Sequence, residues 1–265
     1  MRTILVINSK GGAGKTTLTT NLASYYASQK VRTAIMDCDP QGSSLQWLRQ
    51  RPPHVEQIHG ANAAPASGGT QLRSHRMWVP ENTETLIIDA PAGTNGLLLK
   101  ELVRRARFIL IPVSPSPIDI HATADFIKDL YLVGGARSSG AKIAVVANRV
   151  RHSSPSYETL ERFLTALKLP FLTSISDSDS YVSAVGSGVG VFEMDETATY
   201  VERLELAPIF KWLDGHATVS AAQGTNPSDN VVSIEKSGKF SALRSTGKAL
   251  VSNLISATGR FKIVP

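Results

Sequence analysis

The sequence is poor in the features that mark secreted, metal-binding and membrane-spanning proteins. It has one cysteine, Cys38, in 265 residues, so no intrachain disulfide can form, which suits a reducing compartment. The six histidines show no metal-ligand spacing, and we expect no metal site built from protein ligands alone. No apolar run approaches the ~18 residues of a transmembrane helix, and the first residues do not resemble a signal peptide. Together these absences predict a cytoplasmic globular protein.

Positive charge is concentrated towards the end of the chain. The formal net charge is +6, and residues 215–265 hold six of the 28 Lys and Arg but only two of the 22 acidic residues. Such an excess favours an acidic partner, either DNA or anionic lipid.

The strongest motif lies near the first residue. A short apolar run at 4–7 is followed by Ser-Lys-Gly-Gly-Ala-Gly-Lys-Thr-Thr at 9–17 and by a predicted helix at 18–28. A strand, a glycine-rich loop and a helix form the context in which a P-loop binds phosphate through backbone N–H groups and a helix N-terminus. Lys15 would reach the β- and γ-phosphates, and the Thr16 hydroxyl would bind Mg²⁺. The predicted nucleotide contacts are Gly11, Gly12, Ala13, Gly14, Lys15, Thr16 and Thr17.

Acidic residues end two further predicted strands. Asp37 and Asp39 follow the second apolar run, and Asp89 ends the third. Ligands of open α/β sheets bind at the carboxyl ends of the strands, so these acids should face the phosphates. We predict Thr16, Asp37 and Asp89 as the metal residues, with helix capping as the alternative for Asp37. A carboxylate at 39 could orient water and accept a proton.

The loop also has an early lysine, Lys10, that an ordinary P-loop does not require. Three further stretches accompany it: Asp-Cys-Asp-Pro-Gln at 37–41, Asp-Ala-Pro-Ala-Gly at 89–93 and Ile-Pro-Val-Ser-Pro-Ser-Pro at 111–117. With these stretches the loop resembles the deviant Walker A motif of the ParA/MinD family of dimeric ATPases. The last stretch is similar to the small ParA proteins that segregate plasmids.

The resemblance implies roles for individual residues. Lys10 would reach the nucleotide of the other subunit, and Asp39 would position the attacking water, so the predicted catalytic residues are Lys10, Lys15 and Asp39. Asn148 would recognise the adenine edge, with a strand-end turn as the alternative. Arg149 and Arg151 follow it and are candidates for contacts with DNA or nucleotide, or for an exposed loop.

Strands alternate with helices through residues 1–213. This order predicts a doubly wound α/β domain with five or six strands in a mainly parallel sheet and helices on both faces. Residues 51–80 show no clear pattern. Residues 214–238 are predicted to be a flexible linker, and residues 239–265 a basic amphipathic tail. Three interpretations of this tail stay open: membrane binding through 240–255, a partner's groove, or packing on the domain.

The predicted activity is hydrolysis of ATP to ADP and phosphate with Mg²⁺. The resemblance further implies an ATP-dependent homodimer, non-specific DNA binding, and stimulation by a ParB-like or adaptor partner. Its cargo would be a plasmid, a chromosome or a large protein assembly, and its location the nucleoid in the cytoplasm. The alternatives are a MinD-like membrane-positioning ATPase, a nonenzymatic nucleotide-gated scaffold and a metabolic P-loop enzyme.

Overall fold

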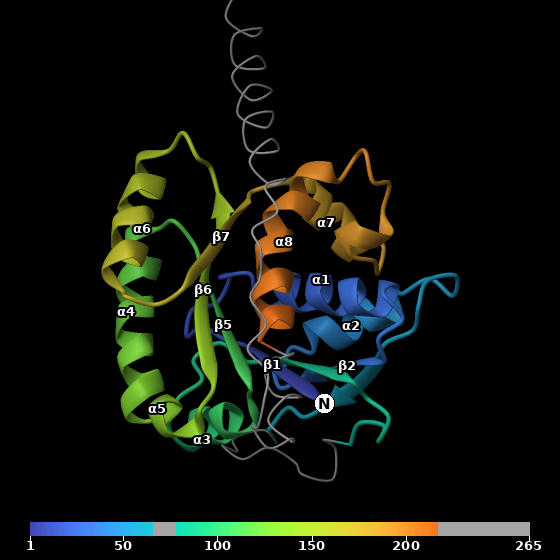
Figure 1. Cartoon of the computed structure of the whole chain (residues 1–265), viewed down its shortest axis with the longest axis horizontal. Coiled ribbons are helices and arrows are strands. Elements are labelled where there is room, and N and C mark those ends of the chain that lie inside the picture. Colours follow the sequence, from blue (N-terminus) through green and yellow to red (C-terminus); the bar gives the residue numbers. More distant parts are fainter. Residues whose placement is uncertain (66–77, 217–265) are drawn as a thin grey trace, which may run out of the picture. The chain divides into compact units, whose positions relative to one another are not determined.

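The computed structural model describes residues 1–65 and 78–216 (Figure 1). Most of the predicted linker and all of the predicted tail therefore lie outside the described residues. Residues 214 and 215, which the sequence placed in the linker, continue the last helix, α8 (Tyr200–Gly215).

Within these ranges the strands form one parallel sheet of seven, in the order β3-β2-β4-β1-β5-β6-β7. The strands are β1 (Arg2–Val6), β2 (Thr33–Asp37), β3 (His59–Asn62), β4 (Thr85–Asp89), β5 (Phe108–Val113), β6 (Lys142–Val150) and β7 (Phe171–Ser176). The doubly wound parallel sheet is confirmed, but five or six strands was too few. The missed strand, β3, lies in the stretch 51–80, which showed no clear pattern. Only Ala61 of its four residues is buried, so the strand has no apolar run that would identify it.

Helices cover both faces of the sheet (Figure 1). One face packs against α3 (Gly96–Arg105), α4 (Pro117–Leu132), α5 (Ala136–Ser139) and α6 (Pro155–Ala166). The other packs against α1 (Lys15–Ser28), α2 (Ser43–Arg49), α7 (Asp179–Gly186), the 3₁₀ turn η2 (Val191–Glu193) and α8. Leu5 and Ile7 enter the first core, while Ile4 and Val6 enter the second. Burial on both faces explains why the strands are continuous apolar runs.

Helix α4 starts at Pro117, the last residue of the Ser-Pro-Ser-Pro run. Proline fits the first turn of a helix, since its missing N–H would have no intrahelical partner there. Within the described ranges, none of the helices combines the length and apolar character that a membrane crossing needs.

The central position of β1 determines where a ligand can bind. From β1 the chain builds one half of the sheet through β2 to β4 and then crosses to the other half, beginning with β5. In such sheets the crevice lies outside the carboxyl ends of the strands, where the direction of winding changes. The glycine-rich loop follows β1 and therefore lies at this crevice.

Candidate active site

The loop between β1 and α1 has the conformation that a phosphate-binding loop requires. Gly12 and Gly14 have φ angles of 78° and 88°, in the left-handed region that favours glycine. Helix α1 starts at Lys15, and no side chain of the described residues caps it. Its first backbone N–H groups therefore point towards the crevice, where they can donate to an anion.

Lys15 is the first residue of α1, at the end of this loop. Its side chain is buried, and Nζ donates to the backbone oxygen of Lys10 at 2.9 Å. Burial lowers the pKa of Lys15, while the nearby charges of Asp89 and Asp39 oppose that shift. A cation with little water around it interacts strongly with a phosphate that enters the same space.

Thr16 and Asp89 form the pair that fits a magnesium ion. The Thr16 hydroxyl donates to Asp89 Oδ2 at 2.9 Å. The other carboxylate oxygen, Oδ1, is buried and has no hydrogen-bond partner among residues 1–65 and 78–216. Burial raises the pKa of Asp89 to about 7, and the nearby Asp37 adds to this. A cation would satisfy the buried oxygen, and carboxylate and hydroxyl oxygens are the ligands Mg²⁺ prefers.

The two acids after β2 have different surroundings. Asp37 Oδ2 accepts hydrogen bonds from Ser44 N, Ser44 Oγ and Leu45 N at 3.1, 2.7 and 3.2 Å, and Oδ1 accepts from Asp39 N at 3.0 Å. These hydrogen bonds cap the start of α2, as the alternative predicted for Asp37 requires. The role of Asp37 as a metal ligand stays a prediction, and these bonds weigh against it. Asp39 is half-buried and lines the crevice, where its Oδ1 accepts from Gln41 N at 2.9 Å.

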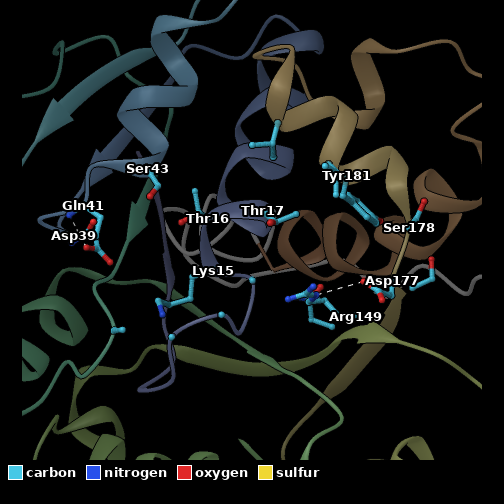
Figure 2. A pocket seen from close by; sticks show the side chains of 18 residues that line it. Lys15, Thr16, Thr17, Asp39, Gln41, Ser43, Arg149, Asp177, Ser178 and Tyr181 are labelled. Carbon is cyan, nitrogen blue, oxygen red and sulfur yellow. Dashed lines mark hydrogen bonds and ion pairs between the residues drawn. The ribbon is translucent and has the colours of Figure 1, made fainter. Parts of the chain in front are cut away.

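The crevice encloses a cavity of about 510 Å³ (Figure 2), a volume typical of small-ligand sites. The loop residues Gly11 to Thr17 border it on one side, and the segment from Asp39 to Ser43 borders it on another. The far end is formed by residues in the last part of β6, at the end of β7, and in the turn and helix that follow β7. They are Asn148, Arg149, Ser176, Asp177, Ser178, Tyr181, Val182 and Val185.

Asn148 contacts the phosphate-binding loop directly. Its Nδ2 donates to Ala13 O at 2.9 Å, and a Cβ added at Gly14 would lie 1.8 Å from this nitrogen. The side chain therefore holds the loop as well as lining the cavity, and its predicted contact with adenine stays a prediction. The close approach gives a second reason, besides the φ angle, for glycine at position 14.

The two arginines after Asn148 share one carboxylate. Arg149 Nε lies 3.5 Å from Asp177 Oδ1, and Arg151 Nη2 lies 2.9 Å from Asp177 Oδ2, which lowers the pKa of Asp177. Arg149 itself has a φ of 56°, a conformation that is costly for a residue with a side chain. Of the two, Arg149 lines the cavity, as Figure 2 shows with its link to Asp177.

Lys10 lies at the mouth of the loop with its side chain partly exposed. Its Nζ is 3.8 Å from Asp119 Oδ1 at the start of α4, and its backbone N–H donates to Asn8 Oδ1 at 3.2 Å. The predicted reach to another subunit concerns two chains and stays a prediction.

Sequence reasoning missed a substantial part of the cavity wall. The missed residues are Gln41, Ser43, Ser176, Asp177, Ser178 and Tyr181. The one signal available for these residues was their position, since all lie at or after the carboxyl end of β2 or β7. Serine and aspartate are common in loops, so residue type alone does not separate these positions from other turns.

Comparison with known proteins also indicates a nucleotide-binding domain. The protein-family model described as "CobQ/CobB/MinD/ParA nucleotide binding domain" matches residues 4–191. The "Maintenance of carboxysome distribution protein A" of Halothiobacillus neapolitanus is 29% identical over 199 residues, which cover 72% of this chain and 87% of that protein.

Two solved structures share the fold. The apo form of McdA from Cyanothece matches with a TM-score of 0.58 and 19% identity, over 82% of this chain and 99% of that chain. The cell-division protein MinD of Aquifex aeolicus matches with a TM-score of 0.58 and 18% identity, over 81% and 98%. The family match spans most of this chain, and its glycine-rich loop, Thr16 and Asp89 lie together at the crevice. This chain belongs to the CobQ/CobB/MinD/ParA family of nucleotide-binding domains.

Proposed function

We propose that this protein is a ParA-type ATPase that dimerises on ATP, binds DNA non-specifically and positions or segregates a cargo. The observation that carries the ATPase part is the convergence of Lys15, Asp39 and the Thr16–Asp89 pair on the crevice after β1. A phosphate-binding loop, a buried cation and two acids with different surroundings are the parts that phosphoryl transfer to water needs.

The reaction converts ATP and water to ADP and phosphate. Backbone N–H groups of the loop and the start of α1 hold the phosphates, and the Lys15 ammonium balances the charge that develops on the γ-phosphate. Asp39 orients the attacking water and accepts its proton as the bond to phosphorus forms. Thr16 and Asp89 would hold Mg²⁺, which supplies further positive charge at the phosphates.

A second copy of the chain would complete the site. Lys10 reaches the nucleotide of the other subunit, so ATP joins two subunits and hydrolysis releases them. Exposed apolar side chains near the crevice support a partner on this face. Leu97, Ile118 and Val182 are 65%, 70% and 72% exposed, and each lies in the first turns of a helix that follows the carboxyl end of a strand.

The relatives favour cargo positioning as the biological role. The Halothiobacillus relative is named for carboxysome distribution, and a Thermus thermophilus relative, 27% identical over 156 residues, is named a chromosome-partitioning ATPase. Both names concern the distribution of large cargoes. We extend that class to this chain, with a ParB-like or adaptor protein that stimulates hydrolysis and with a location at the nucleoid in the cytoplasm.

Hydrolysis and DNA binding are tested on the full chain. Phosphate release is measured with Mg-ATP, and DNA binding is titrated with salt in the presence of ATP and of ADP. We expect tighter, strongly salt-dependent binding with ATP. Lys15→Ala should lose nucleotide binding, whereas Asp39→Ala should keep ATP bound and lose turnover. Equal weak DNA binding in both states would contradict the DNA part, and no hydrolysis even with DNA and the partner protein would favour a nucleotide-gated scaffold.

A MinD-like membrane ATPase is the alternative function. It rests on the basic amphipathic pattern of residues 240–255 in the sequence, which lie outside the described residues. Flotation with anionic liposomes, for the full chain and for a chain that ends at residue 238, separates the two functions. ATP-dependent flotation that disappears with the tail would favour the membrane.

A further inference from the structure

The end of the cavity opposite the phosphate-binding loop is held from outside by helix α8. The segment from Ser176 to Ser178 links β7 to α7 and lines the cavity. Glu205 of α8 accepts two hydrogen bonds from the first residue of this segment, since its Oε2 lies 3.0 Å from Ser176 N and 2.9 Å from Ser176 Oγ. The backbone oxygen of Glu205 also accepts from Thr173 Oγ1 in β7 at 2.7 Å.

A second glutamate holds the other end of the same segment. Glu202 Oε1 accepts from Ser178 Oγ at 2.5 Å, and Ser178 Oγ in turn accepts from Ser180 N at 3.2 Å and caps α7. Burial by itself would raise the pKa of Glu202, but the hydrogen bond from Ser178 and further ones bring its pKa below the usual value. The two carboxylates are three residues apart on α8 and therefore lie on one face of the helix.

Between the two held serines lies Asp177, which pairs with Arg149 and Arg151. Fixing Ser176 and Ser178 fixes the backbone of Asp177, and Asp177 in turn orients Arg149 at the cavity. Two carboxylates that do not themselves line the cavity thus set the position of the 176–178 segment of its far wall.

A nucleotide with its phosphates on the loop at 11–17 would have room for its nucleoside at this far wall, because the lining of the cavity extends from the loop to Asn148 and to residues between 176 and 185. We propose that Glu202 and Glu205 are positioning residues for the nucleoside end of the bound nucleotide, acting through Ser176, Asp177 and Ser178. This inference rests on the proposed nucleotide function and adds to it a division of the site: the loop holds phosphate, and α8 holds the wall for base and sugar.

The test compares a ligand that has a nucleoside with one that lacks it. Binding of ADP and of pyrophosphate to the full chain, both with Mg²⁺, is measured by isothermal titration calorimetry. Glu205→Ala removes two hydrogen bonds to a carboxylate, so ADP binding should weaken about tenfold. Pyrophosphate binding should stay within about twofold, since the loop is untouched. With ATP, KM should rise by a similar factor while kcat stays unchanged.

Two variants and one control make the result interpretable. Glu205→Gln keeps an oxygen acceptor and should restore most of the ADP affinity, and Ser176→Ala, which keeps the backbone N–H bond, should weaken ADP binding about threefold. Glu161→Ala, at an exposed glutamate of α6, should change neither ligand. Ser176→Ala also provides the test if Glu205→Ala does not fold.

Several outcomes would overturn the inference. One is an equal loss of ADP and pyrophosphate binding in Glu205→Ala, which would indicate general damage. Another is unchanged ADP binding in both Glu205→Ala and Ser176→Ala. A wild-type chain that binds pyrophosphate as tightly as ADP would also overturn it, because the nucleoside would then contribute nothing. A wild-type chain that binds neither ligand would instead contradict the proposed nucleotide function.

Discussion

The buried ion pair between Arg51 and Glu193 yields a quantitative prediction about stability. Arg51 follows α2, and Glu193 lies in η2, so the pair joins the segment after α2 to this 3₁₀ turn. Arg51 Nη1 lies 2.9 Å from Glu193 Oε2, and Nη2 contacts Oε1. The two side chains are 1% and 6% exposed. Arg51 also donates to Glu56 O at 2.7 Å and to Gly188 O at 3.3 Å.

Replacing Glu193 by alanine leaves the guanidinium buried without its counter-charge. Removal of one partner from a buried pair costs about 3–5 kcal/mol. The backbone oxygens of Glu56 and Gly188 still accept from Arg51, so we expect a loss near the lower limit, about 3 kcal/mol. The double variant Arg51→Met, Glu193→Leu buries no charge and should lose only about 1 kcal/mol.

Urea unfolding of the full chain, followed by far-ultraviolet circular dichroism, measures these differences at constant slope m. The exposed pair Lys30–Glu56 supplies the control, since Glu56→Ala keeps the backbone oxygen and should cost about 0.5 kcal/mol or less. A loss below about 1 kcal/mol in Glu193→Ala, or a double variant whose loss equals the sum of the two single variants, would refute the reasoning.

Three further predictions concern the phosphate end of the site. Gly14→Ala places a Cβ 1.8 Å from Asn148 Nδ2 at a φ of +88° and should weaken ADP binding at least about tenfold. Gly186→Ala, with open space around it and outside the cavity lining, should keep most of the affinity, and equal losses would contradict the contact. Burial raises the pKa of Asp89 from 3.8 to about 7, so the native chain without Mg²⁺ holds a proton that the unfolded chain releases, and stability should fall as pH rises from 3.8 to about 7. Asp89→Asn should flatten this fall in the urea midpoint, and an unchanged pH profile would refute the assignment. Removing Mg²⁺ with a chelator should stop phosphate release, and Thr16→Ala should raise the Mg²⁺ concentration required for half-maximal rate; the same requirement in both proteins would contradict the role of the hydroxyl.

Much of the fold could be predicted because the sheet is buried on both faces. β5 appears in the sequence as an uninterrupted apolar run, and β2 contains a shorter one between Thr33 and Asp37. Every residue of both strands is buried. β3 has the sequence His-Gly-Ala-Asn and lies at the edge of the sheet. An edge strand buries little, so its apolar pattern is weak, and only its pairing with β2 identifies it.

The candidate site likewise has one part that the sequence predicts and another that it does not. The loop at 11–17 has a motif with a chemical reason for each position. Asp39 follows the end of β2, and Asn148 lies in the last residues of β6. The wall held by α8 has no such local signal. Ser176 and Glu205 are far apart in the chain and meet only because α8 packs beside β7. Contacts of this kind depend on tertiary packing, which no short window of sequence contains.

The central place of β1 also has a consequence for how the chain folds during synthesis. Arg2 pairs with Thr85 of β4, and Ile4 pairs with Phe108 of β5. β1 therefore precedes both of its neighbours in the chain by about 80 residues or more, and synthesis of the stretch between them takes several seconds at roughly 5–20 residues per second. During that interval an apolar strand has neither partner, and long-range parallel pairing of this kind forms slowly. We expect that this protein most needs protection from aggregation while the N-terminal half of the chain is being synthesised.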